Sequence, residues 1–213
     1  LDVRQEIAVR ALVETVAAEH GRLDLMVNNA GIGAGGELRE LTLEHWRTVI
    51  EVNLMGVIHG VAAAYPVMIR QKSGHVVNMA SLSGLIASPG LAPYAATKGA
   101  VVSLTAALRA EAESCGVRAS AVCPGFVMTN IFESAIGVKF DAGDLLARIG
   151  LPVISPAEAA RSILAGIERN QALIVFPRSA RLLWRLARLS PALLRPFQRR
   201  AMKRLREARR RSA

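Results

Sequence analysis

The sequence predicts an α/β domain with a parallel sheet, followed by a basic helical tail. Segments with a helical period of apolar residues alternate with short apolar segments through residues 4–176. This alternation is typical of parallel strands joined by helices. Residues 178–213 hold thirteen Lys and Arg residues against one acid, Glu207, whereas the preceding residues are nearly neutral overall. We therefore expect one domain over residues 1–177 and a separate tail over residues 178–213.

Four segments of the domain have helical patterns, and most have a recognisable start or stop. Gly21 and Gly116 directly follow two of them, where glycine favours a helix end. Thr42 and Ser155 are candidate amino-terminal caps, and Glu158 completes a capping box with Ser155. The expected helices span residues 4–20, about 42–72 with a kink at Pro66, 94–115 and about 156–169.

Short apolar segments between these helices predict strands. The expected strands are Leu1–Val3, Leu23–Asn28, His75–Ala80, Arg118–Cys123 and Ala172–Phe176. Residues 126–154 have weak periodicity and predict a mobile excursion from the domain. Because the sequence opens on Leu1, inside a strand pattern, we expect the beginning of the domain to be missing.

The composition argues against several classes of protein. Aromatic residues make up 4% of the chain, too few for a platform that stacks single-stranded nucleic acid. Cys115 and Cys123 fit neither a metal-ligand spacing nor a disulfide framework, so we expect small core residues in a reducing, cytoplasmic compartment. The charge-free stretch Ser73–Thr97 contains Gly, Pro and Ser and does not have the pattern of a membrane span.

The tail combines arginines with apolar residues at helical spacing. Leu182, Leu189 and Phe197 are among these apolar residues, and Pro191 and Pro196 interrupt the pattern. A basic amphipathic helix suits an anionic membrane surface, and no feature indicates specific binding of nucleic acid. The same apolar residues suit docking against the body or a second subunit, and a solvated helix fits equally well.

Tyr94 and Lys98 form the motif Y-A-A-T-K on an expected helix. Their spacing places both side chains on one helix face, one turn apart. A tyrosine with its usual pKa near 10 is a poor base at neutral pH, whereas a neighbouring ammonium favours the phenolate. The pair can therefore act as a general acid or base on an alcohol or a ketone.

Other polar motifs are expected at the same edge of the sheet. Ser81 follows one strand and precedes Tyr94 by thirteen residues. Asn29-Ala30-Gly31 follows the preceding strand, and Pro124-Gly125 ends the next one. Open parallel sheets bind ligands outside the carboxyl ends of their strands, so the sequence predicts a site at this edge.

Five motifs, in this order and spacing, resemble the short-chain dehydrogenase/reductase family over roughly residues 1–177. They are N-N-A-G at Asn28–Gly31, E-V-N-L-M-G around Asn53, V-N-M-A-S-L-S-G around Ser81, Y-A-A-T-K at Tyr94–Lys98 and P-G-F-V-M-T at Pro124–Thr129. The resemblance implies a Rossmann-like, doubly wound parallel sheet. The family's glycine-rich turn, T-G-x-x-x-G-x-G, has no counterpart, since Gly31–Gly36 follows the wrong strand. We therefore expect the first two βα units to be missing.

The resemblance also implies roles for four catalytic residues. Tyr94 would donate or accept the proton at the substrate oxygen, and Ser81 would hydrogen-bond that oxygen. Lys98 would contact the nicotinamide ribose and tune Tyr94, and Asn53 would hold a water behind Lys98. The further residues implied to contact the cofactor, NAD or NADP, are Asp2, Asn29, Ala30, Gly31, Pro124, Gly125, Val127 and Thr129.

The function implied is an oxidoreductase that interconverts a secondary alcohol and a ketone by hydride transfer. The expected substrate region, residues 82–93 and 126–152, is largely apolar and favours a hydrophobic substrate. Family resemblance implies a homodimer or homotetramer through the helices near residues 43–72 and 94–115. The alternative is a non-catalytic fragment that acts as a membrane-surface or partner-binding module. We expect residues 1–213 alone to form about four strands, to have low solubility and to be a poor enzyme with no measurable alcohol oxidation.

Overall fold

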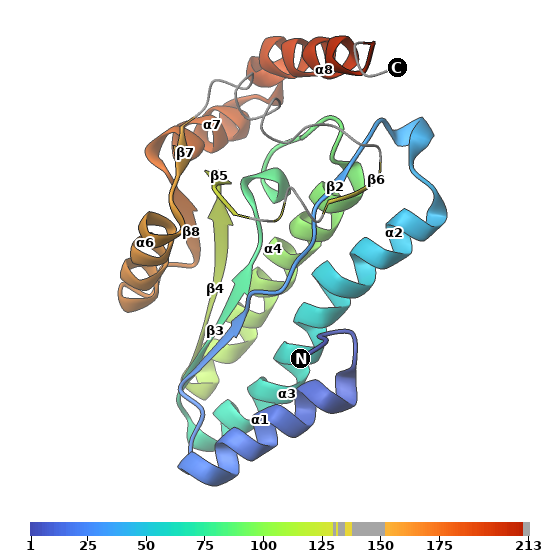
Figure 1. Ribbon diagram of the computed structural model, residues 1–213. Helices are drawn as coiled ribbons and strands as arrows, with labels where there is room; N and C mark the ends of the chain where they lie inside the picture. Colours follow the sequence, from blue (N-terminus) through green and yellow to red (C-terminus); the bar gives the residue numbers. More distant parts are fainter. Residues whose placement is uncertain (130, 132–134, 138–151, 211–213) are drawn as a thin grey trace.

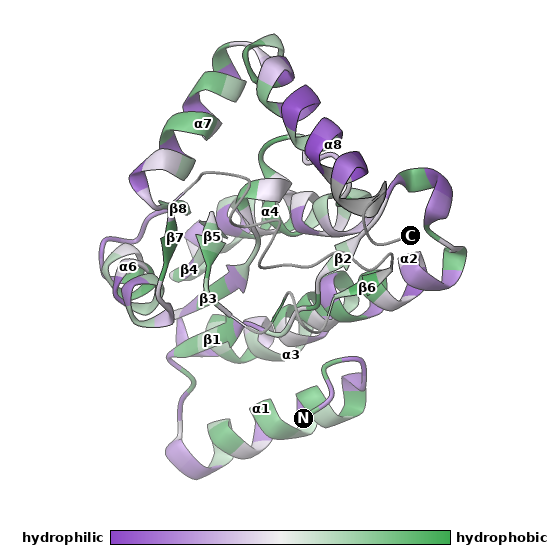
Figure 2. Ribbon diagram, turned by 45° about the horizontal axis from the view of Figure 1, so that its top comes forward, coloured by the Kyte–Doolittle hydropathy of each residue, from purple (hydrophilic) through white to green (hydrophobic). Residues whose placement is uncertain are grey.

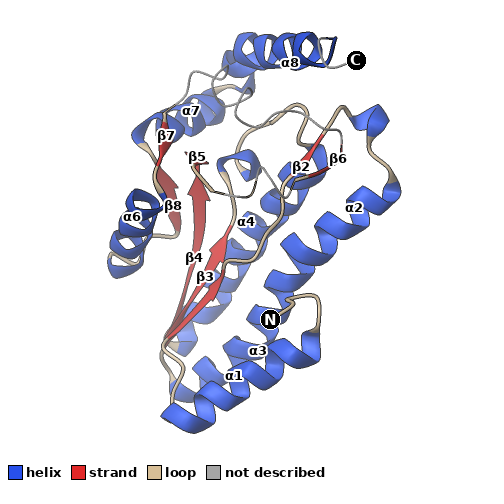
Figure 3. Cartoon of the chain, viewed as in Figure 1, coloured by secondary structure: helices blue, strands red, loops and turns tan. Residues whose placement is uncertain are grey.

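The computed structural model describes residues 1–129, 131, 135–137 and 152–210. Its main sheet has four parallel strands, as the sequence predicts, and their order is β1-β3-β4-β8 (Figures 1 and 3). The strands are β1 Leu25–Asn28, β3 Gly74–Met79, β4 Val117–Pro124 and β8 Leu173–Phe176. Two pairs of very short strands lie above this sheet, β2 Ala34–Gly35 with β6 Ile136–Gly137, and β5 Phe126–Val127 with β7 Val153–Ile154.

Helices cover both faces of the sheet. On one face, α3 (Gly56–Gln71) and α4 (Ala92–Ala112) bury Met68, Val76 and Val101, and α1 (Glu6–His20) packs against α3. On the other face, α6 (Pro156–Glu168) covers β4 and β8 (Figure 2). The expected caps are confirmed, because Gly21 and Gly116 end helices in the left-handed conformation and Ser155 forms the capping box with Glu158.

The helix expected over residues 42–72 is interrupted. Thr42 caps α2 (Leu43–Ile50), a π-helical turn follows at Glu51–Met55, and α3 then continues with Pro66 inside it. The sequence placed the irregularity at Pro66, whereas the widened turn lies earlier and carries the buried Asn53. Such single π turns are frequent at functional sites. By length and composition Leu43–Gln71 could cross a membrane, but it packs on β1 and β3.

The strand predicted at Leu1–Val3 is wrong. These residues lead into a turn, and Val3 packs on Gly56, where an added Cβ would lie 2.6 Å from Val3 Cγ2. Val3 O contacts His59 Nδ1 at 2.9 Å. A strand needs a neighbour for its backbone groups, and no described strand lies beside residues 1–3.

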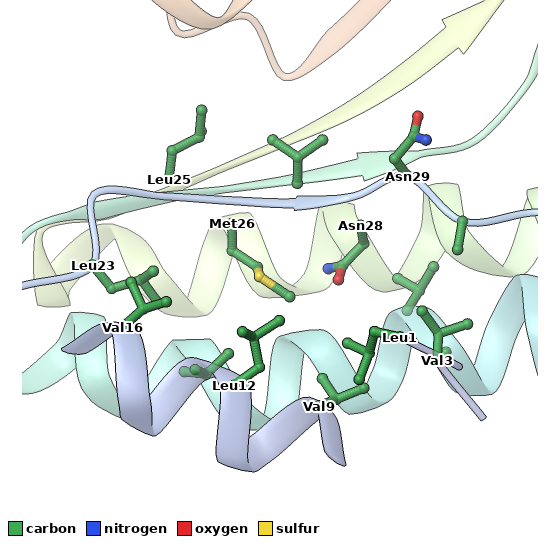
Figure 4. Close-up of a pocket in the computed structure, with 15 residues that line it drawn as sticks. Leu1, Val3, Val9, Leu12, Val16, Leu23, Leu25, Met26, Asn28 and Asn29 are labelled. Atoms are coloured by element: carbon green, nitrogen blue, oxygen red, sulfur yellow. The ribbon is translucent and has the colours of Figure 1, made fainter. Parts of the chain in front are cut away.

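Within the described residues, β1 forms an edge of the main sheet. It pairs with β3 on one side, and Leu25 and Val27 are 40% and 43% exposed. Between β1 and α1 lies an apolar cavity of about 360 Å³, with Leu12 and Met26 facing each other across it (Figure 4). The α1 helix therefore leaves space where a covered sheet would be filled.

The tail is helical, as predicted. It consists of α7 (Arg178–Leu189), a 3-10 turn at Pro191–Leu194 and α8 (Arg195–Arg210). Ala180 of α7 is buried beside Val175, so α7 docks on the body. Most of the excursion expected over residues 126–154 lies outside the described residues.

Candidate active site

Ser81, Tyr94 and Lys98 meet beyond the carboxyl end of β3, as the sequence predicts. Ser81 caps the 3-10 turn Leu82–Gly84, and its Oγ accepts a hydrogen bond from Ser83 N at 3.1 Å. The Ser81 side chain also lies close enough to the Tyr94 phenol to influence the pKa of that phenol. On α4, one turn from Tyr94, Lys98 places its Nζ 5.8 Å from the centroid of the Tyr94 ring. The three side chains therefore share one site.

Lys98 is almost fully enclosed. Its residue is 2% exposed, and Nζ donates a hydrogen bond to Met79 O, at the end of β3, at 2.7 Å. Burial penalises the ammonium and lowers the pKa of Lys98 to about 8. Lys98 can therefore exchange its proton close to neutral pH.

The phenol of Tyr94 differs from its expected state. Burial raises the pKa of Tyr94 above its ordinary value, and the nearby Ser81 side chain opposes this effect. The sequence predicted a pKa lowered by Lys98, and that prediction is wrong for this structure, because desolvation of the phenolate dominates. Tyr94 is consequently protonated at neutral pH, which suits donation of a proton to a carbonyl oxygen.

Asn53 binds the loop that follows β1. Its Oδ1 accepts a hydrogen bond from Ile32 N at 2.8 Å, and its Nδ2 donates to Ile32 O at 2.9 Å. Nδ2 also contacts Thr97 Oγ1 at 3.5 Å. A Cβ added at Gly31 would lie 3.2 Å from Asn53 Oδ1 and 3.3 Å from Lys98 Nζ. The structure thus brings Asn53 and Lys98 to one point at Gly31, and the expected water behind Lys98 stays a prediction.

Two buried polar residues that support the site were missed in the sequence. Thr97 Oγ1 donates a hydrogen bond to Tyr94 O at 2.9 Å and fixes the turn that carries Tyr94. Asn78 of β3 accepts from Asn28 Nδ2 at 2.7 Å and donates to Thr105 Oγ1 at 2.9 Å. The sequence signal that could have found them is a polar residue at a position that the apolar pattern predicts to be buried. Such a residue needs a hydrogen-bond partner.

The residues expected to contact the cofactor lie in two groups at the carboxyl edge. Asn29–Gly31 follows β1 directly, beside Lys98. The second group starts at Pro124, at the end of β4, and continues through Val127 in β5 to the exposed Thr129. Their contacts with a cofactor stay predictions.

Asp2 does not lie at a strand end, contrary to the expectation. Its carboxylate accepts hydrogen bonds from Arg4, one of them from Nη2 at 2.7 Å. These hydrogen bonds hold the pKa of Asp2 at about 2. An adenine bound by Asp2 would first have to displace Arg4.

The side chains present suit the nicotinamide half of NAD(P) better than its pyrophosphate. The absence of a side chain at Gly31 leaves backbone beside Asn53 and Lys98, where a ribose could approach closely. The sequence holds no glycine-rich turn between a strand and a helix of the kind that binds a pyrophosphate. The described residues therefore suit the nicotinamide side, and their contacts with it stay predictions.

A parallel α/β sheet with Ser81, Tyr94 and Lys98 gathered at its carboxyl edge defines a class, the Rossmann-like proteins that bind ligands at that edge. Residues 1–136 match the family model described as short chain dehydrogenase. The chain belongs to the short-chain dehydrogenase/reductase family, which confirms the resemblance seen in the motifs.

Individual relatives agree with this membership. An uncharacterized oxidoreductase of Staphylococcus saprophyticus is 37% identical over 166 residues, covering 76% of this chain and 66% of that protein. A 3-oxoacyl-(acyl-carrier-protein) reductase of Staphylococcus aureus is 38% identical over 126 residues, covering 59% and 51%. A short chain dehydrogenase/reductase from Burkholderia phymatum, solved in complex with NAD, has a TM-score of 0.78 at 31% identity, covering 91% and 75%. The chain therefore spans 51–66% of the length of these two curated relatives.

Proposed function

We propose that the site around Tyr94 interconverts a secondary alcohol and a ketone by hydride transfer, with NAD(H) or NADP(H) as the cofactor. The observation that carries the proposal is the shared site of Ser81, Tyr94 and Lys98 in a chain of this family. A relative solved with NAD supports the cofactor class. The nicotinamide supplies or accepts the hydride when it is bound.

The residues of the chain would position the substrate and move one proton. Ser81 and Tyr94 would both hydrogen-bond the substrate oxygen, with Tyr94 giving its proton to a ketone or taking it from an alcohol. The protonated state of Tyr94 favours the donor role. Lys98, with its lowered pKa, would return a proton to Tyr94 after each turnover.

A hydrophobic substrate fits the loop between Ser81 and Tyr94. Leu85 and Ile86 of this loop are only partly buried and pack against the core of α4 and β4. The reductase of Staphylococcus aureus, whose name specifies a 3-oxoacyl substrate, supports a ketone on an acyl chain.

Binding of the cofactor is the first test. Titration of the chain with NADH and with NADPH, followed by nicotinamide fluorescence, should show saturable binding. Lys98→Met should weaken it about tenfold, as expected for one lost hydrogen bond from a charged group. Lys203→Met, on the exposed face of α8, is the matched control and should bind like the wild type. Absence of binding to both cofactors would reject the proposal and favour the non-catalytic module.

The tail supports a second role, reversible binding to an anionic lipid surface. Leu182 and Leu189 are 58% and 79% exposed on one face of α7, beside Arg178 and Arg185. Exposed apolar residues among cations suit the interface of a charged bilayer. Because salt screens this attraction, binding should fade at high ionic strength.

Vesicle co-sedimentation tests the tail without deleting it, since removal of α7 would open the core at Ala180. The variant Leu182→Asp/Leu189→Asp should lose sedimentation with vesicles that contain phosphatidylserine. Leu38→Asp, at an exposed leucine of the body, should keep it. Equal sedimentation of both variants, or none by the wild type, would reject this role.

A further inference from the structure

The last helix of the tail, α8, lies across the carboxyl edge of the sheet (Figures 1 and 2). Gln198 Nε2 donates a hydrogen bond to Ala87 O at 3.1 Å. Arg206 donates from Nε and Nη2 to the Glu37 carboxylate at 3.0 and 3.1 Å. The helix is thus attached at two points that are far apart in the sequence.

Both attachment points belong to loops that border the candidate active site. Ala87 lies in the loop between Ser81 and Tyr94, and Glu37 follows the loop that carries Gly31. The two loops are themselves joined, because Gly36 N donates to Gly90 O at 2.9 Å. The α8 helix therefore bridges two loops that border the candidate active site.

Glu37 is a fixed anchor rather than a surface carboxylate. Its side chain is 9% exposed, and it caps the 3-10 turn Leu38–Glu40 by accepting a backbone hydrogen bond. Arg206 is 61% exposed and meets the carboxylate with two nitrogens, a geometry that strengthens an ion pair. Arg206 of α8 is therefore the exposed partner of this ion pair, and salt can weaken the contact.

The two faces of α8 differ in character. Phe197, Ala201 and Met202 are partly covered on the side of the helix that also carries Gln198. Arg199, Arg200 and Lys203 are exposed on the other side. The covered side thus presents apolar groups to the body, next to the loop that contains Leu85 and Ile86.

We propose that α8 forms the outer wall of the substrate site and that the ion pair of Arg206 with Glu37 latches it. Leu194, which is 4% exposed, fixes the near end of the helix to the body. Release of the latch would then let α8 move relative to this fixed end. The substrate part of this inference rests on the proposed function, and a substrate with a long apolar chain would contact Phe197 and Met202.

Amide hydrogen exchange of the full chain tests the latch without any need for catalysis. Arg206→Ala should speed exchange in residues 195–204 and in residues 82–93 about 3- to 10-fold, the effect of losing one partly exposed ion pair. Arg199→Ala, at an exposed arginine of the same helix, is the control and should exchange like the wild type. High salt should speed exchange in the wild type and change Arg206→Ala little. Equal exchange of Arg206→Ala and the wild type would overturn the latch.

The wall is tested with two ketones in the presence of NADP⁺. A long-chain methyl ketone should slow exchange in residues 197–202 of the wild type, whereas acetone should slow it only in residues 82–93. Slowing by the long-chain ketone in residues 82–93 but not in α8 would overturn the wall and leave the proposed function standing. No slowing by either ketone would overturn the wall and count against the proposed function, while the result on Arg206→Ala still decides the latch.

Discussion

Asn53 holds Ile32 through both ends of its amide, with Oδ1 2.8 Å from Ile32 N and Nδ2 2.9 Å from Ile32 O. This pair ties the π turn to the loop after β1. In Asn53→Asp the carboxylate keeps an acceptor but loses the donor, and a charge becomes buried. We expect the free energy of unfolding to fall by about 1–3 kcal/mol, measured by urea denaturation. Asn29→Asp, at an exposed neighbour, should cost far less, and an equal loss in both variants would contradict the clamp.

Lys98 should lower the free energy of unfolding at neutral pH, because its ammonium group is buried in the candidate active site. Its pKa in the folded state, about 8, lies below the ordinary lysine value of 10.5, so folding is penalised wherever the unfolded chain holds the proton more strongly. The penalty is full below pH 8 and disappears as the pH rises through 10.5. Lys98→Met should therefore be more stable than the wild type near pH 7 by about 1–2 kcal/mol, after loss of the hydrogen bond to Met79. A Lys98→Met variant that is less stable at pH 7 would contradict this account.

His75 should make the protein sensitive to mild acid. Its Nε2 lies 2.8 Å from Ser120 Oγ, which donates to Gln171 O, so Nε2 must carry the proton. Among the described residues, Nδ1 has no hydrogen-bond partner. Burial, with Arg118 and Arg109 nearby, lowers the pKa of His75 from 6.5 to about 4. The unfolded chain thus binds a proton that the folded chain refuses.

Because the pKa of His75 is lower in the folded chain than in the unfolded chain, acid destabilises the fold. Stability should fall as the pH drops from 6.5 to 4, by about 3 kcal/mol in total. Urea denaturation at several pH values is the measurement. In His75→Gln this slope should be largely absent, whereas His20→Gln should retain it. A wild type whose stability is level over this range would refute the account.

The α4 helix should form a contact between subunits. Ser103, Ala106, Ala107 and Ala110 are exposed along one face of it, where small side chains allow close helix packing. Light scattering should find a homodimer or homotetramer at micromolar concentration. Ala107→Arg should shift it to the monomer, whereas Ala11→Arg, on an exposed face of α1, should not. A wild-type monomer would contradict the prediction.

The sequence predicted the four parallel strands of the main sheet and the meeting of the catalytic side chains well. Apolar periodicity places β3 and α4, and these elements alone bring Ser81 to Tyr94. The prediction of a strand at Leu1–Val3 was wrong because a strand depends on a neighbouring strand, and a local sequence pattern does not show whether one is present. The π turn at Asn53 was not predicted from the sequence. Asn53 binds Ile32, twenty-one positions away in the sequence, and a local pattern does not contain such a contact.

The state of Tyr94 also depended on the fold rather than on the motif. The spacing of Y-A-A-T-K correctly placed Lys98 near the ring, but the pKa is set by how much water the folded chain excludes. The attachment of α8 through Arg206 and Glu37 was likewise invisible, since the tail pattern allowed solvent, membrane or docking equally.

Transfer of deuterium tests the central claim most directly. The chain is incubated with a long-chain methyl ketone and with NADH or NADPH deuterated at the transferable position, and the alcohol is analysed by mass spectrometry. Label accumulates over hours, so turnover that is too slow for a direct assay of alcohol oxidation is still detected. We predict deuterium on the carbinol carbon, a rate lowered at least about 100-fold in Tyr94→Phe, and an unchanged rate in the exposed control Ser103→Ala. Unlabelled product, no product at saturating cofactor, or equal labelling by Tyr94→Phe would contradict the account.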